Sequence, residues 1–122
     1  MQKILIVDDE NDTRDLLKKG LEKNKFDVLT ASGGEEALNI CKSTKPDLIL
    51  LDIIMPELDG YEVCKRLRAD DKTRDIPVLF LTGKDLGPEG IAELYTKLGA
   101  AGYIAKPSTF EEILKKIKGV IG

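Results

Sequence analysis

The chain has 122 residues, which is long enough for one domain with a substantial hydrophobic core. Its net charge of −3 argues against direct nucleic-acid binding, which needs a clustered basic face. No apolar run approaches the roughly 20 residues that span a bilayer, and residues 1–3 show no secretory pattern. We therefore expect a cytoplasmic protein without membrane contact. The absence of histidine removes the commonest general base and zinc ligand.

Five stretches of the chain predict strands. Residues 4–7, 48–51 and 78–81 are short runs of apolar residues, which is typical of strands buried on both faces. Residues 26–31 and 102–105 have mixed composition. We therefore place the first three in the interior of a sheet and the other two at its edges.

Stretches with helical spacing lie between and after these strands. In the first of them, Asn11 or Asp12 can cap the helix, and Leu16, Leu17 and Leu21 form its expected buried stripe. Ser108 or Thr109 caps the last helix. The predicted helices cover residues 12–24, 35–43, 58–69 and 88–98, and the last begins after residue 109 and buries Phe110, Ile113, Leu114 and Ile117.

Alternation of strands and helices predicts a parallel sheet with helices on both faces. With right-handed crossovers, the simplest strand order is 2-1-3-4-5, a doubly wound α/β fold of the flavodoxin-like class. The chain then reverses direction between strands 1 and 3, and ligands bind outside the carboxyl ends of the strands at such a point. We find no repeat or linker, so we expect one domain over residues 1–122 with no output domain.

Polar residues follow the predicted strands at these carboxyl ends. Asp8 and Asp9 follow the first strand, and Asp52 follows the third. Thr82 and Lys106 lie at the ends of the fourth and fifth. Because the carboxyl ends of parallel strands meet at one edge of the sheet, we expect these five side chains to converge on one crevice.

Three carboxylates at one edge repel one another, and each pair costs about 3 kcal/mol at ~5 Å and an effective dielectric of ~20. A divalent cation relieves this repulsion, and oxygen ligands without His or Cys favour Mg²⁺ or Mn²⁺ over zinc. An acidic helix-capping loop without a metal is the alternative, but Asp52 lies outside that loop.

The same crevice has the groups that phosphoryl transfer needs. Lys106 can pair with Asp52 and later hold a phosphoryl oxygen, and Thr82 offers a hydroxyl donor. A carboxylate nucleophile, a metal, an ammonium and a hydroxyl position the phosphoryl group and neutralise its charge. We therefore predict that Asp52 is a covalent phosphate acceptor.

The sequence resembles the receiver domain of two-component response regulators over essentially its whole length. The matching segments are residues 6–10, 51–56 with 59–60, 81–83, and 103–107, and their order and spacing together are specific. The resemblance implies a flavodoxin-like fold. It also implies that Asp52 takes phosphate from a phosphohistidine on a sensor histidine kinase or a histidine phosphotransfer protein.

The resemblance further implies the metal ligands. Mg²⁺ would be held by Asp9, Asp52 and the backbone carbonyl of Ile54, with Asp8 acting through water. Such a domain is a phosphoacceptor signalling module rather than an enzyme, although it assists its own phosphorylation and dephosphorylation. Because Ile54 has no amide or acid to orient an attacking water, we expect slow self-dephosphorylation.

A switch is also implied by the resemblance. Thr82 would move toward the phosphoryl group and Tyr103 would change rotamer. The face formed by the fourth helix, fifth strand and fifth helix would then change its preference for a downstream protein or output domain. The same analogy implies a cis peptide between Lys106 and Pro107. The alternative for Tyr103 is an edge-strand tyrosine packed on Ile91 or Leu94 without a switching role.

Three other functions compete with this interpretation. A haloacid dehalogenase-type phosphatase requires a second Asp where this chain has Ile54. An FMN-binding flavodoxin needs a hydroxyl- and amide-rich phosphate loop where this chain has Asp8, Asp9 and Glu10. A degenerate receiver that acts as a phosphorylation-independent interaction module is the non-catalytic alternative, and the presence of all five polar residues argues against it.

Overall fold

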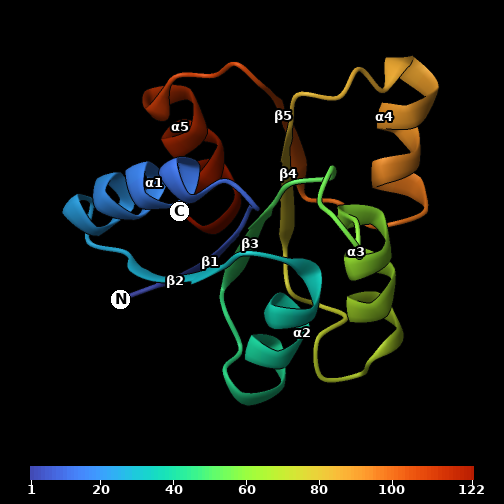
Figure 1. Ribbon diagram of the computed structural model, residues 1–122, viewed down its shortest axis with the longest axis horizontal. Coiled ribbons are helices and arrows are strands. Elements are labelled where there is room, and N and C mark those ends of the chain that lie inside the picture. Colours follow the sequence, from blue (N-terminus) through green and yellow to red (C-terminus); the bar gives the residue numbers. More distant parts are fainter.

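The computed structural model describes residues 1–122 as five strands that alternate with five helices (Figure 1). The strands are β1 (Lys3–Val7), β2 (Asp27–Ala31), β3 (Leu48–Leu51), β4 (Val78–Thr82) and β5 (Gly102–Ala105). The helices are α1 (Asn11–Lys23), α2 (Gly34–Ser43), α3 (Gly60–Ala69), α4 (Gly87–Thr96) and α5 (Phe110–Ile121).

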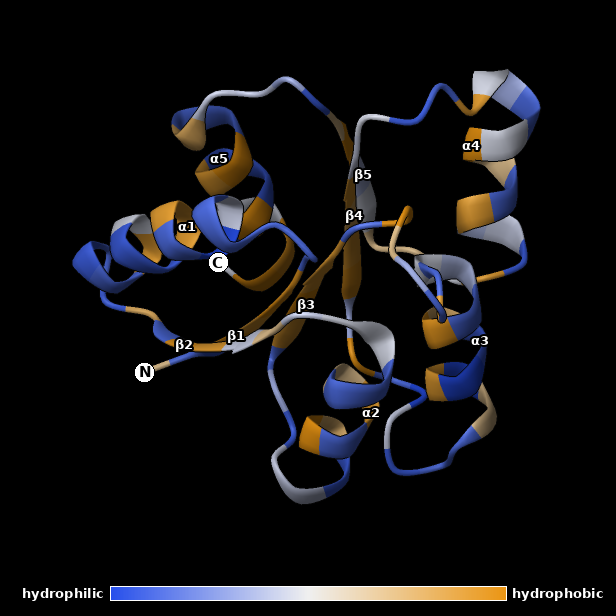
Figure 2. Cartoon of the chain, in the orientation of Figure 1, coloured by the Kyte–Doolittle hydropathy of each residue, from blue (hydrophilic) through white to orange (hydrophobic).

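All strand pairs are parallel, and their order is β2-β1-β3-β4-β5, which confirms the prediction. Helices α1 and α5 cover one face of the sheet, and α2, α3 and α4 lie on the other (Figure 1). Figure 2 shows hydrophobic residues along the central strands and mixed residues along the helices. This contrast follows from burial, because β3 and β4 are buried at every position while the helices bury one side only.

Each face of the sheet has its own hydrophobic core. The cluster under α2, α3 and α4 has 18 buried residues, and the cluster under α1 and α5 has 13. Successive residues of one strand feed the two cores alternately, as Leu5 and Ile6 do in β1. The sheet therefore packs against both cores, and this packing holds the strand ends in a fixed arrangement.

None of the helices is long and apolar enough to cross a bilayer.

Several predicted helix ends were wrong. Helix α3 begins at Gly60 rather than residue 58, because the Asp59 carboxylate accepts a hydrogen bond from the backbone N–H of Glu62 at 3.0 Å and caps the helix. Helix α1 is preceded by Glu10, which makes no side-chain capping bond, and the expected capping residue Asn11 lies inside the first turn. Helix α4 ends at Thr96, earlier than the predicted residue 98.

Candidate functional site

The neighbouring strands β1 and β3 place two carboxylates side by side. Val7 pairs with Leu51 at the ends of these strands, and the backbone N–H of Asp52 donates to the carbonyl oxygen of Val7 at 3.0 Å. Asp8 and Asp52 are therefore the first residues beyond two hydrogen-bonded strand ends.

These carboxylates form a cluster with Asp9. Oxygen atoms of the three side chains all lie within 4.8 Å of one another. Asp8 and Asp52 are buried, with 2% and 7% of their surfaces exposed, whereas Asp9 is exposed. Asp8 is fixed by the backbone N–H of Glu10, which donates to its Oδ1 at 2.9 Å. The structure therefore brings together the three acidic residues that the sequence singled out.

Lys106 extends its ammonium from the end of β5 into this cluster. The Nζ atom lies 3.0 Å from Oδ2 of Asp8 and 3.5 Å from Oδ2 of Asp52. The contact with Asp52 was anticipated, but the shorter contact is with Asp8. Burial works to lower the pKa of Lys106, but the hydrogen bond and charge of Asp8 and the charge of Asp52 outweigh it and raise that pKa. The ammonium therefore stays charged.

The pKa of Asp52 is raised, and burial is the largest cause. The charge of Lys106 lowers it and the charge of Asp8 raises it again, while the backbone amides of Ile53 and Ile54 lower it. Burial and the charge of Asp8 thus outweigh the one ammonium at Asp52. A further positive charge beside Asp52 would favour its ionised form.

A divalent cation fits this donor set. The cluster offers only carboxylate oxygens, and the chain has no histidine. Hard cations such as Mg²⁺ prefer oxygen ligands and are commonly held by one or two carboxylates together with water. The Ile54 side chain, with 59% of its surface exposed, points away from the core at the loop that follows Asp52.

Thr82 ends β4 at the other side of the crevice. Its side chain is buried, and its Oγ1 accepts a hydrogen bond from the backbone N–H of Lys84 at 3.1 Å. The carbonyl of Thr82 accepts from the backbone N–H of Lys106 at 2.9 Å, which ties the ends of β4 and β5 together. Tyr103 lies next to Phe80 in the β4–β5 register and is half-buried against the core under α2, α3 and α4.

Gly60 supports the site in a way that sequence reasoning missed. A Cβ atom at this position would lie 2.3 Å from the carbonyl oxygen of Asp52 and 2.8 Å from Cα of Ile53. The backbone N–H of Gly60 donates to the carbonyl of Ile53 at 2.8 Å. The first turn of α3 therefore packs directly on the backbone that carries Asp52. A glycine straight after the capping Asp59 was the available sequence signal.

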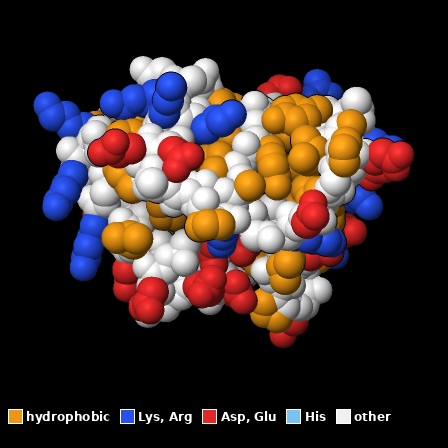
Figure 3. Space-filling view, turned by 90° about the horizontal axis from the view of Figure 1, so that it is seen from above, with side chains coloured by type: hydrophobic (Ala, Val, Ile, Leu, Met, Phe, Trp, Pro, Cys, Tyr) orange, Lys and Arg blue, Asp and Glu red, His pale blue; other side chains and the backbone are white.

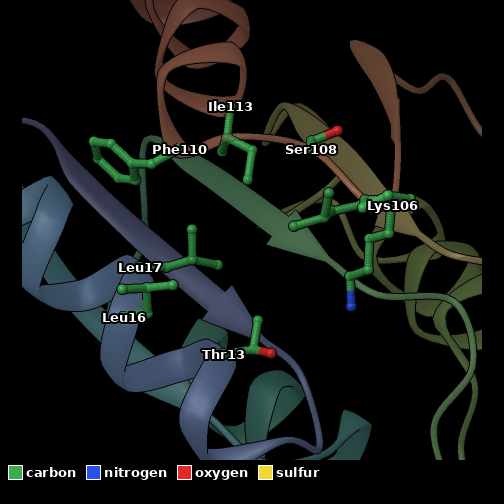
Figure 4. A pocket seen from close by; sticks show the side chains of 9 residues that line it. Thr13, Leu16, Leu17, Lys106, Ser108, Phe110 and Ile113 are labelled. Carbon is green, nitrogen blue, oxygen red and sulfur yellow. The ribbon is translucent and has the colours of Figure 1, made fainter.

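An apolar pocket of about 410 Å³ adjoins Lys106 between α1 and α5 (Figure 4). Leu17 and Ile113 line it from the two helices, and Leu16 lies at its rim with 68% of its surface exposed. The expected burial of Leu16 was wrong, because this side chain lies at the open edge of the pocket between α1 and α5. The Lys106–Pro107 peptide at the edge of the pocket is cis.

The doubly wound sheet and this acidic crevice at its switch point together place the chain in the class of receiver-type signalling domains. A family model for the response regulator receiver domain matches residues 4–118, and the chain belongs to that family. Members of the family bind Mg²⁺ at an acidic site of this kind.

Named relatives agree with this membership. The chain is 44% identical to the alkaline phosphatase synthesis transcriptional regulatory protein PhoP of Bacillus subtilis (strain 168), over 98% of this chain and 48% of PhoP. It is 40% identical to the response regulator MprA of Mycolicibacterium vanbaalenii, over 98% of this chain and 50% of MprA. The chain thus spans about half the length of the curated relatives that it matches.

Solved structures show the same fold. The chemotaxis protein CheY4 of Vibrio cholerae superposes with a TM-score of 0.91 at 33% identity, over 98% of both chains. The response regulator TrrA of Thermotoga maritima, solved in complex with Mg²⁺ and BeF, gives a TM-score of 0.85 at 35% identity, over 98% of this chain and 99% of TrrA.

Proposed function

We propose that this receiver domain accepts a phosphoryl group on Asp52 from a sensor histidine kinase or a histidine phosphotransfer protein, in the cytoplasm and with Mg²⁺. The observation that carries the proposal is the placement of Asp52, a buried carboxylate within 3.5 Å of a lysine ammonium and beside two further carboxylates. The proposed site residues are Asp52, Lys106 and Thr82 for the chemistry, and Asp8, Asp9, Asp52 and the Ile54 carbonyl for the metal.

In the proposed reaction, an Oδ atom of Asp52 attacks the phosphorus of a phosphohistidine. The new O–P bond forms as the P–N bond breaks, and the imidazole of the donor leaves with the electron pair and takes up a proton. The Lys106 ammonium is within reach of a phosphoryl oxygen on Asp52, and the Thr82 hydroxyl can donate to another once it turns toward the site. These groups neutralise and position the transferred group, which is the main requirement of phosphoryl transfer.

The metal would be held by the carboxylates of Asp9 and Asp52 and the backbone carbonyl of Ile54, with Asp8 acting through water. When bound, Mg²⁺ neutralises charge on phosphoryl oxygens, and Mn²⁺ would substitute for it. The carboxylate oxygens within 4.8 Å of one another support this assignment, because their mutual repulsion is relieved by a shared cation.

We infer that phosphorylation changes the face formed by α4, β5 and α5 through Thr82 and Tyr103, and so controls a downstream protein or an output domain. The hydrogen bond from the Lys84 backbone to Thr82 Oγ1 supports this route, because turning the hydroxyl breaks a contact with the segment that leads to α4. A Tyr103→Ala variant that is phosphorylated normally yet keeps the full response of this face would contradict a role for Tyr103.

The lifetime of the phosphorylated form should be long. Ile54, two residues after Asp52, is exposed and has no polar group to orient an attacking water. Replacement of Ile54 by Asn, which can orient water, should shorten the lifetime measured after removal of the phosphodonor. An unchanged lifetime would count against this role for position 54.

Phosphorylation is tested with acetyl phosphate and Mg²⁺, followed by intact-mass spectrometry. We expect one added phosphoryl group, stable in acid and labile in base, that is absent with EDTA and in Asp52→Asn. The exposed Asp75→Asn is the matched control and should be modified like the parent. A domain that forms no adduct and binds no beryllofluoride would instead be a degenerate, phosphorylation-independent interaction module.

A further inference from the structure

Arg68, in the last turn of α3, joins three segments of the chain through one side chain. Its Nε donates to the carbonyl of Leu98 at 2.9 Å, and its Nη2 donates to that of Gly99 at 3.2 Å. Its Nη1 donates to the carbonyls of Arg74 and Ile76 at 3.0 and 2.9 Å. The guanidinium thus connects α3, the segment before β4 and the turn that follows α4.

The acceptors of Arg68 are all neutral backbone carbonyls, and the side chain makes no ion pair. A planar fork with several donors in fixed directions suits such a set of carbonyls, whereas a lysine ammonium would not match it. Gly99 leaves room for this contact. Its φ is +62°, and a Cβ atom there would already lie 3.4 Å from Nε of Arg68.

Arg68 binds just beyond the C-terminal end of α4, which other hydrogen bonds also hold in place. The backbone N–H of Ala100 donates to the carbonyl of Leu94 at 2.9 Å, and that of Ala101 donates to Val78 at 2.8 Å. The thiol of Cys64 also donates to the carbonyl of Leu98, at 3.5 Å. The C-terminal end of α4 is therefore tied to α3 and to the sheet.

The opposite end of α4 has fewer ties to the rest of the domain. The Asp85 carboxylate accepts from the backbone N–H of Gly87 at 3.2 Å, and Leu86 is half-buried against the core, but no backbone hydrogen bond joins residues 85–90 to α3 or to the sheet. Leu94, near the C-terminal end, is the only fully buried residue of α4. Figure 1 places this helix at the outer corner of its layer. Upstream, Lys84 contacts Thr82 Oγ1 through its backbone. The loosely held end of α4 is thus the end that connects to the phosphorylation site.

We propose that Arg68 is a positioning residue for α4, which clamps the turn at Leu98 and Gly99 so that this helix moves as a lever about its C-terminal end. The clamp itself depends only on the hydrogen bonds of Arg68. The lever motion rests on the proposed function, because it needs Thr82 to respond to a phosphoryl group on Asp52.

The clamp is tested by amide hydrogen exchange of the unphosphorylated protein. Arg68→Gln removes the fork, and Arg68→Lys keeps the charge without it. Loss of the two hydrogen bonds to Leu98 and Gly99, in the turn that follows α4, predicts faster exchange over residues 91–101 by roughly tenfold or more in both variants. Amides of β1 and β3 should follow only the change in global stability. Arg66→Gln is the control, because Arg66 is on the same helix but pairs with Glu62 and Glu35.

Two results would overturn the clamp. In the first, residues 91–101 exchange faster only in step with β1 and β3, which means that Arg68 supports the domain as a whole. In the second, Arg68→Lys restores parental exchange, which means that charge alone is sufficient. If Arg68→Gln does not fold, Arg68→Lys and the parent decide the question.

The lever is tested by NMR amide shifts on addition of Mg²⁺ and beryllofluoride. In the parent we expect large changes over residues 83–92 and small ones over residues 97–101, and in Arg68→Lys we expect the changes to spread into residues 97–101. Equal changes at both ends in the parent would overturn the lever. If the parent binds no beryllofluoride, the proposed function fails and with it the lever, while the exchange experiment still tests the clamp.

Discussion

The two faces of the sheet are closed in different ways. On one face, α1 and α5 pack directly on each other, and Gly20 approaches Phe110 so closely that a Cβ would lie 2.5 Å from its ring. On the other face, α2 and α3 make a similar contact, where a Cβ on Gly34 would lie 2.6 Å from Val63. Helix α4 has no such partner and is anchored in the core through Leu94.

This difference separates a tightly packed side of the site from a more loosely packed one. Asp8 precedes α1 and Lys106 precedes α5, and the 3.0 Å ion pair between them joins the two elements of the well-packed face. Thr82 leads into α4. Figure 3, which views the molecule from the end where β4 and β5 finish, shows hydrophobic side chains gathered on the side where Figure 1 places α4. Tyr95 of this helix is exposed. If the proposed function holds, we expect a change at the site to be transmitted through α4.

The largest expected contrast is between the core residues Ile117 of α5 and Leu94 of α4, both of which are fully buried. Ile117→Ala should lower the free energy of unfolding by about 2–5 kcal/mol, because it leaves a cavity in a closed layer. Leu94→Ala should lower it less and should instead release α4 locally. Urea unfolding measures the first effect, and hydrogen exchange of residues 87–96 measures the second.

Ile91→Ala, at a half-buried position of α4, is the control for shortening a side chain on this helix. It should change both quantities less than Leu94→Ala does. The proposed difference between the two faces is wrong if Leu94→Ala and Ile117→Ala lower the free energy of unfolding equally and the amides of α4 exchange no faster than those of the rest of the domain.

The second contrast concerns two glycines at helix positions. Gly60→Ala should lower the free energy of unfolding by about 1–3 kcal/mol, because the new methyl group meets the Asp52 backbone rather than a movable side chain. It should also slow phosphorylation of Asp52. Gly119→Ala in α5 meets nothing within 4 Å and should stabilise the domain by up to about 1 kcal/mol. Urea midpoints of the two variants should therefore shift in opposite directions.

The strand order could be predicted because composition distinguishes the interior strands from the edges. The five polar residues of the site could be predicted because each lies at or just after the carboxyl end of a strand. Other features depend on packing. A helical stripe predicts the buried side of α1 but not the pocket between α1 and α5, so the exposure of Leu16 was missed. The close approach at Gly60 depends on the path of the preceding loop. Arg68 could not be distinguished in the sequence from its solvent-exposed neighbour Arg66.

The environment of Asp52 predicts how pH affects metal binding. Burial raises the pKa of Asp52, so its carboxylate is protonated at a higher pH than an ordinary aspartate. At pH values above the pKa that Asp52 has in the unfolded chain, its ionised carboxylate destabilises the folded domain, and a bound cation offsets this destabilisation. Mg²⁺ at 100 times its dissociation constant should add about 2.7 kcal/mol to the free energy of unfolding.

This stabilisation should shrink as the pH falls through the folded pKa of Asp52, because the protonated carboxyl is a poor ligand. Thermal unfolding with and without Mg²⁺, at neutral pH and in steps toward acid, measures it. Asp9→Asn should reduce the effect at every pH, and the exposed Asp75→Asn should leave it unchanged. A Mg²⁺ shift that is independent of both pH and Asp9 would place the ion elsewhere.

The smallest contrast lies in the first turns of α5 and α4. Helix α5 has a capping box, in which Thr109 Oγ1 accepts from the Glu112 backbone at 3.1 Å and the Glu112 carboxylate accepts from the Thr109 backbone at 3.0 Å. Thr109→Ala should lower the free energy of unfolding by about 1 kcal/mol, and Glu89→Ala, at an exposed position in the first turn of α4, should cost less. Urea midpoints of the two variants compare them.

The bond from the Thr109 backbone is also the main reason that the pKa of Glu112 is lowered. A carboxyl with a lowered folded pKa contributes stability that is present above its unfolded pKa and is lost as the pH falls through the folded pKa. Glu112→Gln should therefore weaken the loss of stability in acid, whereas Glu111→Gln, whose side chain makes no bond to Thr109, should keep it. If both variants follow the parental pH profile, the capping box does not hold the first turn of α5, and the first turns of α5 and α4 do not differ in the way that the comparison of the two faces requires.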